Sequence, residues 1–169
     1  MEMAVNPGDR APDFELFSQE MLAGPPPRFK SYRLSAALGQ GPVVLHFFPM
    51  PFTGVCEAQM CAVRDNLGST YASRGVQVWG VTGHYPFPIQ AWDREHRFGV
   101  PVLADYEHTV SEQYVGTYPD LLGLRKVTKR GVVAVSRDGV VRYVWITDDP
   151  LVAPGEEVVG EAVAKAQGT

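Results

Sequence analysis

The sequence predicts an α/β protein in which a central mixed sheet is covered by helices. Short apolar runs of strand length alternate with segments of helical periodicity through most of the chain. Two further apolar runs then flank Arg-Asp-Gly at 137–139, a hairpin turn signal, and a helical segment closes the chain. The 169 residues suffice for one sizeable core, and no linker divides them, so we expect a single domain over 1–169.

Strands are expected where apolar residues run continuously or alternate with polar ones. The clearest is 43–48, a buried run that opens with two valines. The remaining strand segments are 11–16, 76–82, 100–104, 131–136 and 140–146. Helices are expected over 54–73, 88–98, 109–114 and 155–166.

This order gives a β-α-β-α unit followed by a β-β-α unit. With the strand near the N-terminus, it describes a thioredoxin-like fold carrying an N-terminal β extension. Gly-Pro-Pro-Pro at 24–27 is expected to form a stiff surface turn within that extension.

The composition argues against several functional classes. The formal net charge is −4 and no basic tract is present, so nucleic acid is not an expected partner. No apolar segment approaches the ~18 residues of a membrane span, so no membrane association is expected. The first ten residues lack the cationic-then-apolar layout of a secretion signal, which predicts a cytoplasmic, reducing location. Two cysteines in such a compartment are more often reactive than structural.

The strongest functional signal lies where the strand 43–48 passes into the following helix. The strand breaks at Pro49 and Pro51, and the first helical turn carries Cys56. Unpaired N–H groups and the helix macrodipole favour an anion there, so this position favours the nucleophilic thiolate. The alternative is a small buried hydrophobe, because Cys56 shares a core-facing stripe with residues 60, 63, 67 and 71.

Cys61 falls about 120° from that stripe, among polar residues of the same helix. A structural cysteine prefers burial, so we interpret Cys61 as a resolving thiol that attacks oxidised Cys56. Two alternatives stay open. One is a thiol without a role, exposed or covered by another segment; the other is a zinc ligand, although a Cys-x4-Cys pair without a second pair is a weak zinc signal.

Helix geometry constrains how the two cysteines react. Five residues along an α-helix separate two Cα atoms by roughly 8.6 Å, whereas a disulfide needs Cα atoms within about 7 Å. We therefore predict that oxidation unwinds this segment locally, with Gly54 and the prolines easing the rearrangement.

The pattern Pro49-x-x-x-Thr53-x-x-Cys56 after a buried strand closely resembles the active-site signature of the peroxiredoxins, thiol peroxidases on a thioredoxin fold. Residues 8–16 resemble that family's N-terminal segment, and 129–139 its arginine-strand-turn segment. A second cysteine five residues after the first is the mark of the bacterioferritin-comigratory, or Q-type, subfamily. The surrounding Phe-Thr-Gly-Val-Cys-Glu also resembles the alkyl hydroperoxide reductase E type, which usually lacks that second cysteine. The presence of Cys61 favours the Q type.

The resemblance implies a role for each residue of the motif. Cys56 attacks one peroxide oxygen, and Cys61 resolves the resulting sulfenic acid as an intramolecular disulfide. The Thr53 hydroxyl and the Cys56 backbone N–H orient the peroxide, while Arg130 supplies a permanent positive charge. Pro49 shields the sulfur from water. The alternatives are an ordinary solvated arginine at 130 and a plain helix-start proline at 49.

Other residues near the motif carry weaker expectations. Gln59, one turn after Cys56, either braces the arginine or is a plain surface residue. His46 is expected to be a hydrogen-bonded core histidine, at a strand position commonly aromatic in relatives. His84 is expected in the loop after the strand 76–82, where one possible position for its side chain is toward the site. Three apolar side chains either rim the site or pack in the core: Phe48, Met50 and Phe52.

The predicted function is reduction of hydrogen peroxide and organic hydroperoxides, with a thioredoxin-like dithiol protein restoring the cysteines. No cofactor, metal or haem is implied. One alternative is a one-cysteine peroxidase resolved by an external thiol, and another is a peroxide sensor that relays oxidation to a partner. A general disulfide oxidoreductase is disfavoured because no Cys-x-x-Cys is present. Q-type relatives are often monomeric and E-type relatives dimeric, so monomer and homodimer both remain open.

Overall fold

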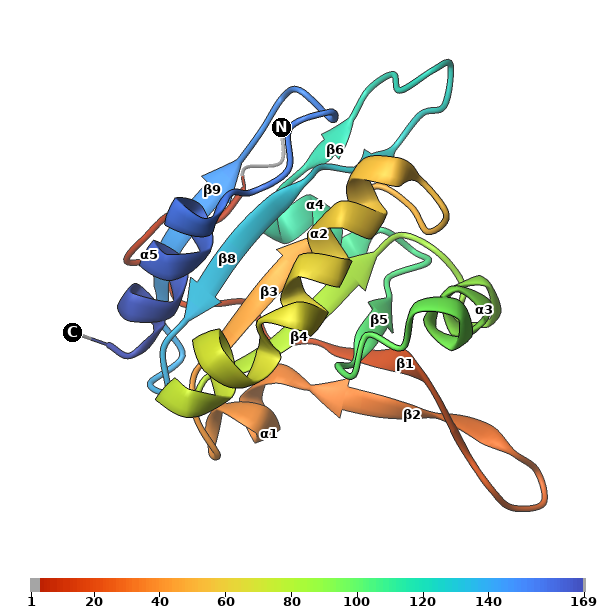
Figure 1. Ribbon diagram of the computed structural model, residues 1–169, viewed down its shortest axis with the longest axis horizontal. Coiled ribbons are helices and arrows are strands. Elements are labelled where there is room, and N and C mark those ends of the chain that lie inside the picture. Colours follow the sequence, from red (N-terminus) through yellow and green to blue (C-terminus); the bar gives the residue numbers. More distant parts are fainter. Residues whose placement is uncertain (1–3, 169) are drawn as a thin grey trace.

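The computed structural model describes residues 4–168, and these form a seven-stranded mixed sheet with helices on both faces (Figure 1). The strands lie in the order β2-β1-β5-β4-β3-β8-β9. Their bounds are β1 Glu15–Leu22, β2 Arg28–Arg33, β3 Val43–Phe47, β4 Gln77–Thr82, β5 Val102–Ala104, β8 Gly131–Val135 and β9 Val141–Ile146. A separate two-stranded ladder joins β6, Thr117–Tyr118, to β7, Val127–Thr128.

The centre of the sheet is parallel and its flanks are antiparallel. β3 pairs in parallel with β4, which pairs in parallel with β5, whereas β8 runs antiparallel to β3 and β9 antiparallel to β8. Every residue of β3 and β8 is buried, as expected for central strands covered on both faces. Because successive side chains alternate between the faces, Val44 joins one hydrophobic core and Val43 and Leu45 join the other.

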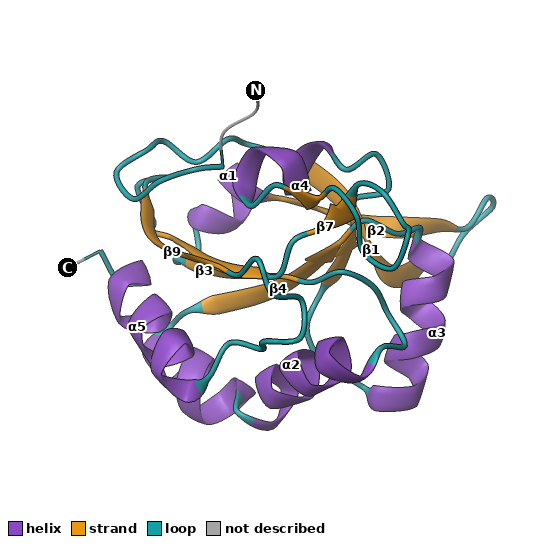
Figure 2. Ribbon diagram, turned by 90° about the horizontal axis from the view of Figure 1, so that it is seen from above, coloured by secondary structure: helices purple, strands orange, loops and turns teal. Residues whose placement is uncertain are grey.

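Figure 2 shows the two helical layers. On one face lie α2, Gly54–Asp65, α3, Pro86–His96, and α5, Glu156–Ala166. The opposite face carries two shorter helices, α1, Leu34–Leu38, and α4, Thr109–Tyr114. Gly80 of β4 lets α2 approach the sheet closely, because a Cβ at this position would lie 3.0 Å from the Met60 side chain.

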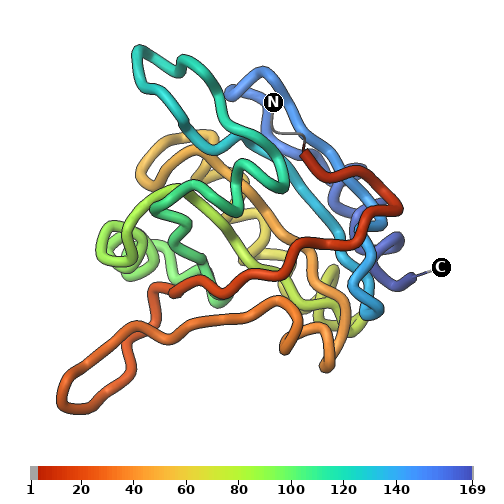
Figure 3. Tube along the Cα trace, turned by 180° about the vertical axis from the view of Figure 1, so that it is seen from behind, coloured from red at the N-terminus to blue at the C-terminus, as the bar shows by residue number. Residues whose placement is uncertain are grey.

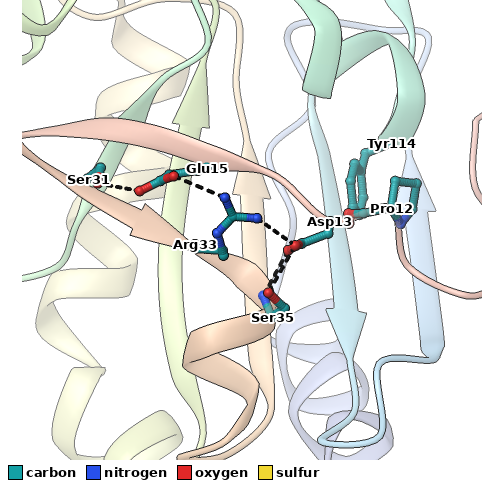
Figure 4. Close-up of polar contacts among 7 residues, drawn as sticks. All are labelled: Pro12, Asp13, Glu15, Ser31, Arg33, Ser35 and Tyr114. Atoms are coloured by element: carbon teal, nitrogen blue, oxygen red, sulfur yellow. Dashed lines mark hydrogen bonds and ion pairs between the residues drawn. The ribbon is translucent and has the colours of Figure 1, made fainter.

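The N-terminal extension runs across the α1 and α4 face and then forms the β1–β2 hairpin, which projects beyond the sheet (Figure 3). Polar contacts fasten its start (Figure 4). The Asp13 carboxylate accepts hydrogen bonds from the Ser35 backbone N–H at 2.9 Å and from the Arg33 guanidinium at 3.0 Å. Tyr114 of α4 donates its hydroxyl hydrogen to the Pro12 carbonyl. These contacts tie both helices of this layer to the extension.

The structure confirms the predicted thioredoxin-like arrangement and corrects several boundaries. The first strand begins at Glu15 rather than 11 and continues to Leu22. The turn at 24–27 joins β1 to β2, a strand that the sequence analysis did not predict, as it did not predict α1, β6 or β7. The helix expected over 54–73 ends at Asp65. A π-helical turn, Leu67–Tyr71, and a 3₁₀ turn, Ala72–Arg74, follow it.

Within residues 4–168, no helix is both long enough and apolar enough to cross a membrane. Three of the ten N-terminal residues used for the prediction of no secretion signal, residues 1–3, lie outside the described part of the chain.

Candidate active site

The site begins where β3 passes into α2. The chain leaves β3, turns through Pro49–Phe52 and enters α2 at Gly54, so Cys56 is the third helical residue. The turn is held against the neighbouring strand β4, because the Thr82 hydroxyl donates a hydrogen bond to the Pro49 carbonyl at 3.1 Å. Phe52 adopts a left-handed φ of 65°, which lets the chain reverse immediately before the helix.

The Cys56 thiol is 1% exposed and lies in the first turn of α2. Backbone N–H groups of a first helical turn have no intrahelical acceptor, so the N–H of Cys56 is available to an incoming oxygen. The Thr53 backbone carbonyl accepts the first helical hydrogen bond, from Glu57 N–H at 2.9 Å. The Thr53 hydroxyl donates to the Met50 carbonyl at 3.0 Å, which holds its oxygen beside the same turn.

Arg130 reaches Cys56 from the other side of the site. Arg130 directly precedes β8, which pairs with β3 so that Gly131 lies opposite Phe47. The antiparallel register therefore brings Arg130 to the end of β3 at which α2 begins. One guanidinium nitrogen lies 3.5 Å from Cys56 Sγ and donates to Gln59 Oε1 at 2.9 Å. The Pro150 carbonyl accepts from the other side of the guanidinium at 3.2 and 2.7 Å.

Arg130 is 2% exposed, so it is a buried cation beside the thiol rather than a solvated flanking residue. Two neutral oxygens hold it in one orientation without cancelling its charge. Gln59 is likewise 2% exposed and holds the arginine, as the bracing interpretation predicted.

Behind Gln59 runs a buried chain of hydrogen bonds. Since Gln59 Oε1 accepts from Arg130, its amide nitrogen faces His46 and donates to Nδ1 at 3.0 Å. The other imidazole nitrogen of His46 then carries hydrogen and donates to the Tyr71 hydroxyl at 2.9 Å. His46 is thus the hydrogen-bonded core histidine expected from sequence. Its complete burial lowers its pKa to about 4, so the imidazole is neutral at neutral pH.

Above Cys56 opens a pocket of about 300 Å³ whose exposed lining is largely apolar. It is lined by Pro49, Met50, Thr53, Gly54, Val55, Cys56, Leu121, Leu122, Arg130, Pro150 and Leu151. Leu122 and Leu151 are strongly exposed, at 94% and 76%, and form the lips of the pocket. The arrangement combines a buried sulfur and a fixed cation at the floor with apolar walls above them.

The structure brings together four of the five predicted catalytic residues, Pro49, Thr53, Cys56 and Arg130, but not Cys61. Cys61 is half-buried where α3 covers α2, which matches the alternative of a thiol covered by another segment that the sequence left open. Its Sγ lies 3.9 Å from Nδ1 of His96, the last residue of α3. Both cysteines are free thiols.

The apolar residues expected around the site divide between two environments. Met50 lines the pocket, whereas Phe48 is fully buried and packs against Trp92 in the core. Phe52 is 54% exposed and also approaches Trp92. His84 does not line the pocket.

Four residues that line the pocket, all in two loops, were not predicted from the sequence. Leu121 and Leu122 lie in the loop between β6 and β7, and Pro150 and Leu151 lie in the loop after β9. Pro150 acts through its backbone carbonyl, which no side-chain pattern reveals. A run such as Asp-Leu-Leu-Gly-Leu in a loop is a weak signal of an exposed apolar surface. Among residues 4–168, no group of three or more His, Cys, Asp or Glu side chains is arranged to hold a metal ion.

The fold and the position of Cys56 define a class: thioredoxin-like proteins that carry a cysteine at the start of the helix after a central strand. Comparison with known proteins narrows this class. Residues 7–144 match the model of the AhpC/TSA family. Alkyl hydroperoxide reductase E of Mycobacterium tuberculosis is 28% identical over 140 residues, which cover 82% of this chain and 84% of the relative. Chloroplastic peroxiredoxin Q of Triticum aestivum is 30% identical over 141 residues, covering 83% and 59%.

Two solved structures are similar to this chain over most of its length. The peroxidoxin BcpB from Mycobacterium tuberculosis superposes with a TM-score of 0.77 at 27% identity, covering 96% of both chains. The reduced 2-Cys peroxiredoxin of Plasmodium vivax has a TM-score of 0.78 at 19% identity, covering 95% of this chain and 81% of that one, and supports the fold alone.

The chain belongs to the AhpC/TSA family of peroxiredoxins and is a thiol-dependent peroxidase. Peroxides as substrates and thioredoxin-type reductants are typical of that family.

Proposed function

We propose that this protein reduces hydrogen peroxide and organic hydroperoxides through Cys56, that Cys61 resolves the oxidised sulfur, and that a thioredoxin-like dithiol protein restores both thiols. The observation that carries the proposal is the Arg130 nitrogen 3.5 Å from Cys56 Sγ at the floor of the pocket. A fixed cation there stabilises the thiolate before attack and the departing oxygen during it.

The peroxide step follows from this arrangement. The Cys56 thiolate attacks the nearer peroxide oxygen, the O–O bond breaks, and sulfur gives up two electrons. The product is a sulfenic acid, and the departing alkoxide or hydroxide takes a proton to leave as alcohol or water. The Thr53 hydroxyl and the Cys56 N–H hold the peroxide in line, and Pro49 covers the sulfur from bulk water.

The apolar walls support organic hydroperoxides as substrates. A pocket of about 300 Å³ exceeds what hydrogen peroxide requires, and its exposed leucines offer contact area to an alkyl group. Hydrogen peroxide uses only the polar floor.

Resolution requires a rearrangement, because α2 is continuous from Gly54 to Asp65 and includes both cysteines. In an intact helix the two Cα atoms stand roughly 8.6 Å apart, too far for a disulfide. We propose that the first turns of α2 unwind after Cys56 is oxidised, which brings Cys61 to it. We further propose a cytoplasmic location and either a monomer or a homodimer, with no membrane or nucleic-acid partner.

The test is peroxide consumption coupled to a thioredoxin system, comparing the wild type with Cys56→Ser and Cys61→Ser. Cys56→Ser should abolish turnover. Cys61→Ser should retain one rapid reaction with peroxide but lose thioredoxin-coupled turnover. Mass spectrometry of peroxide-treated wild type should show the loss of two hydrogens.

Two other outcomes identify the alternatives. A gain of oxygen at Cys56, with full turnover by Cys61→Ser and an external thiol, would identify a one-cysteine peroxidase. Slow turnover with abundant thioredoxin, together with a trapped mixed disulfide, would identify a peroxide sensor that relays oxidation to a partner.

A further inference from the structure

Cys61 lies at one end of a side-chain cluster that spans α2 and α3. Its Sγ is 3.9 Å from Nδ1 of His96, within hydrogen-bond reach for sulfur. The opposite ring nitrogen, Nε2, lies 2.9 Å from Glu57 Oε1. The indole N–H of Trp92 donates to the same carboxylate oxygen at 3.3 Å. The His96 imidazole therefore connects the Cys61 thiol to the Glu57 carboxylate, with one contact at each ring nitrogen.

The carboxylate fixes which imidazole nitrogen is basic. An oxygen that accepts from Nε2 requires hydrogen on that nitrogen, so in the neutral ring Nδ1 is unprotonated. That free lone pair faces the Cys61 thiol. A base oriented by a third group toward a nucleophile is the general pattern of an activated thiol.

The imidazole is also held in position by packing. The His96 ring stacks on Phe98 with centroids 5.4 Å apart and meets Trp92 edge-on at 5.9 Å. Its backbone carbonyl accepts from the Arg64 guanidinium at 2.8 Å, which ties the end of α3 to α2. The ring cannot turn away from Cys61 without breaking these contacts.

Cys61 needs such a base. Partial burial raises the pKa of its thiol, and the negative charges of Asp65 and Glu57 add to this effect, while Arg64 opposes it. The charged groups around the Cys61 thiol are Glu57, Arg64 and Asp65 on α2, and the group that faces it from α3 is the His96 imidazole. At neutral pH the unaided thiol is therefore almost wholly protonated and a poor nucleophile.

We propose that His96 is a catalytic general base of the resolution step: it removes the Cys61 proton, and Glu57 is a positioning residue that orients the ring and stabilises the imidazolium. This inference rests on the proposed resolving role of Cys61. The Cys61 thiolate attacks the Cys56 sulfenic acid, an S–S bond forms, the S–O bond breaks and hydroxide leaves. The proton taken by His96 balances that hydroxide, so the net products are one disulfide and one water.

The experiment is a single-turnover stopped-flow measurement with one equivalent of hydrogen peroxide. Sulfenic acid formation appears as a phase whose rate depends on peroxide concentration, and disulfide formation as a later phase that does not. His96→Gln retains a donor for Glu57 and a side chain of similar reach, but no base. Glu95→Gln, an exposed position one residue away, is the matched control.

In His96→Gln the first phase should be unchanged and the second about 10²-fold slower near neutral pH, the usual size of a general-base contribution. Its second phase should accelerate about tenfold per pH unit, because solvent must now deprotonate Cys61. The wild type and Glu95→Gln should share a flatter profile. Glu57→Gln should slow the second phase less than His96→Gln does, since it keeps an acceptor for the ring but loses the charge.

A second measurement tests the same base without the peroxide reaction, so a variant with an impaired active site does not obscure the result. In a Cys56→Ser background, alkylation of Cys61 by iodoacetamide should slow when His96→Gln is added, with the same change in pH dependence. Equal second-phase rates and equal alkylation profiles with and without His96 would overturn the proposal while leaving Cys61 as the resolving thiol. The absence of any second phase or disulfide in the wild type would instead overturn the resolving role itself.

Discussion

His46 offers a quantitative test of the buried hydrogen-bond chain behind the active site. Replacing it with phenylalanine keeps an aromatic ring in β3 but removes both hydrogen-bonding nitrogens. The Tyr71 hydroxyl then loses its hydrogen-bond partner in a buried setting, and the Gln59 amide nitrogen keeps only its 3.5 Å contact to the Phe47 carbonyl. An unsatisfied buried polar group costs about 1–3 kcal/mol. Because Gln59 keeps one weak contact, the total loss in free energy of unfolding should be about 2–4 kcal/mol near neutral pH.

The same substitution should change the pH dependence of stability. Folding lowers the pKa of His46 from 6.5 to about 4. Between these values the unfolded chain binds the extra proton and the folded protein does not, so stability falls as the pH falls. The contribution is fully present above about pH 6.5 and is lost by about pH 4, a difference of about 3 kcal/mol. His46→Phe lacks this term, so its stability should approach that of the wild type on acidification.

Urea unfolding measured from about pH 7 to about pH 5 tests this, because the wild type should lose about 2 kcal/mol through His46 over that interval. All other titrating groups are common to both proteins and cancel in the difference. Tyr71→Phe is the matched control: it removes one hydroxyl of the chain but keeps the imidazole, so its curve should stay parallel to that of the wild type. A gap between wild type and His46→Phe that does not shrink toward acid pH would refute the argument that burial keeps His46 neutral.

Three further predictions concern the site itself. Arg130→Lys keeps a positive charge, but a lysine cannot contact Cys56, Gln59 and the Pro150 carbonyl together. The rate constant for the reaction of Cys56 with peroxide should therefore fall about 10²–10³-fold in single-turnover kinetics. A fall of less than about threefold would contradict the role assigned to Arg130. Leu151→Ser removes an apolar lip worth about 1 kcal/mol of contact, so kcat/KM should drop about fivefold for a bulky organic hydroperoxide and stay constant for hydrogen peroxide; equal losses for both substrates would argue against an alkyl-binding wall. Hydrogen exchange of amides 55–62 should accelerate in the disulfide form, and equal protection in both redox states would contradict local unwinding of α2.

Most of the fold could be predicted from sequence because its signals are local. Continuous apolar runs located the buried central strands, and the turn at 137–139 located the β8–β9 hairpin. β2 was missed because Phe29 and Tyr32 stand three residues apart among charged and polar ones, so this half-buried edge strand shows neither alternation nor an apolar run. The break after Asp65 was missed because helical periodicity continues across it, while Asn66 and Gly68 weaken the helix.

The candidate site was predictable where one segment carries it and unpredictable where tertiary packing does. Thr53 and Cys56 share a turn, and Arg130 is placed by the pairing of β8 with β3. The approach of His96 to Cys61 depends on how α3 packs against α2, across 35 positions of sequence. Helical phase alone put Cys61 among polar residues away from the core-facing stripe, and it could not show that a neighbouring helix covers that side.

The Pro150 carbonyl that holds Arg130 has a consequence for how substrate preference diversifies. A main-chain oxygen is present whatever side chain stands at that position, so the loop can exchange its residues and still orient the guanidinium. Leu151 and, in a separate loop, Leu122 line the pocket, so either leucine can be exchanged without removing that carbonyl. Grafting either loop from a related peroxidase should therefore alter which hydroperoxides are accepted without disturbing the reacting sulfur.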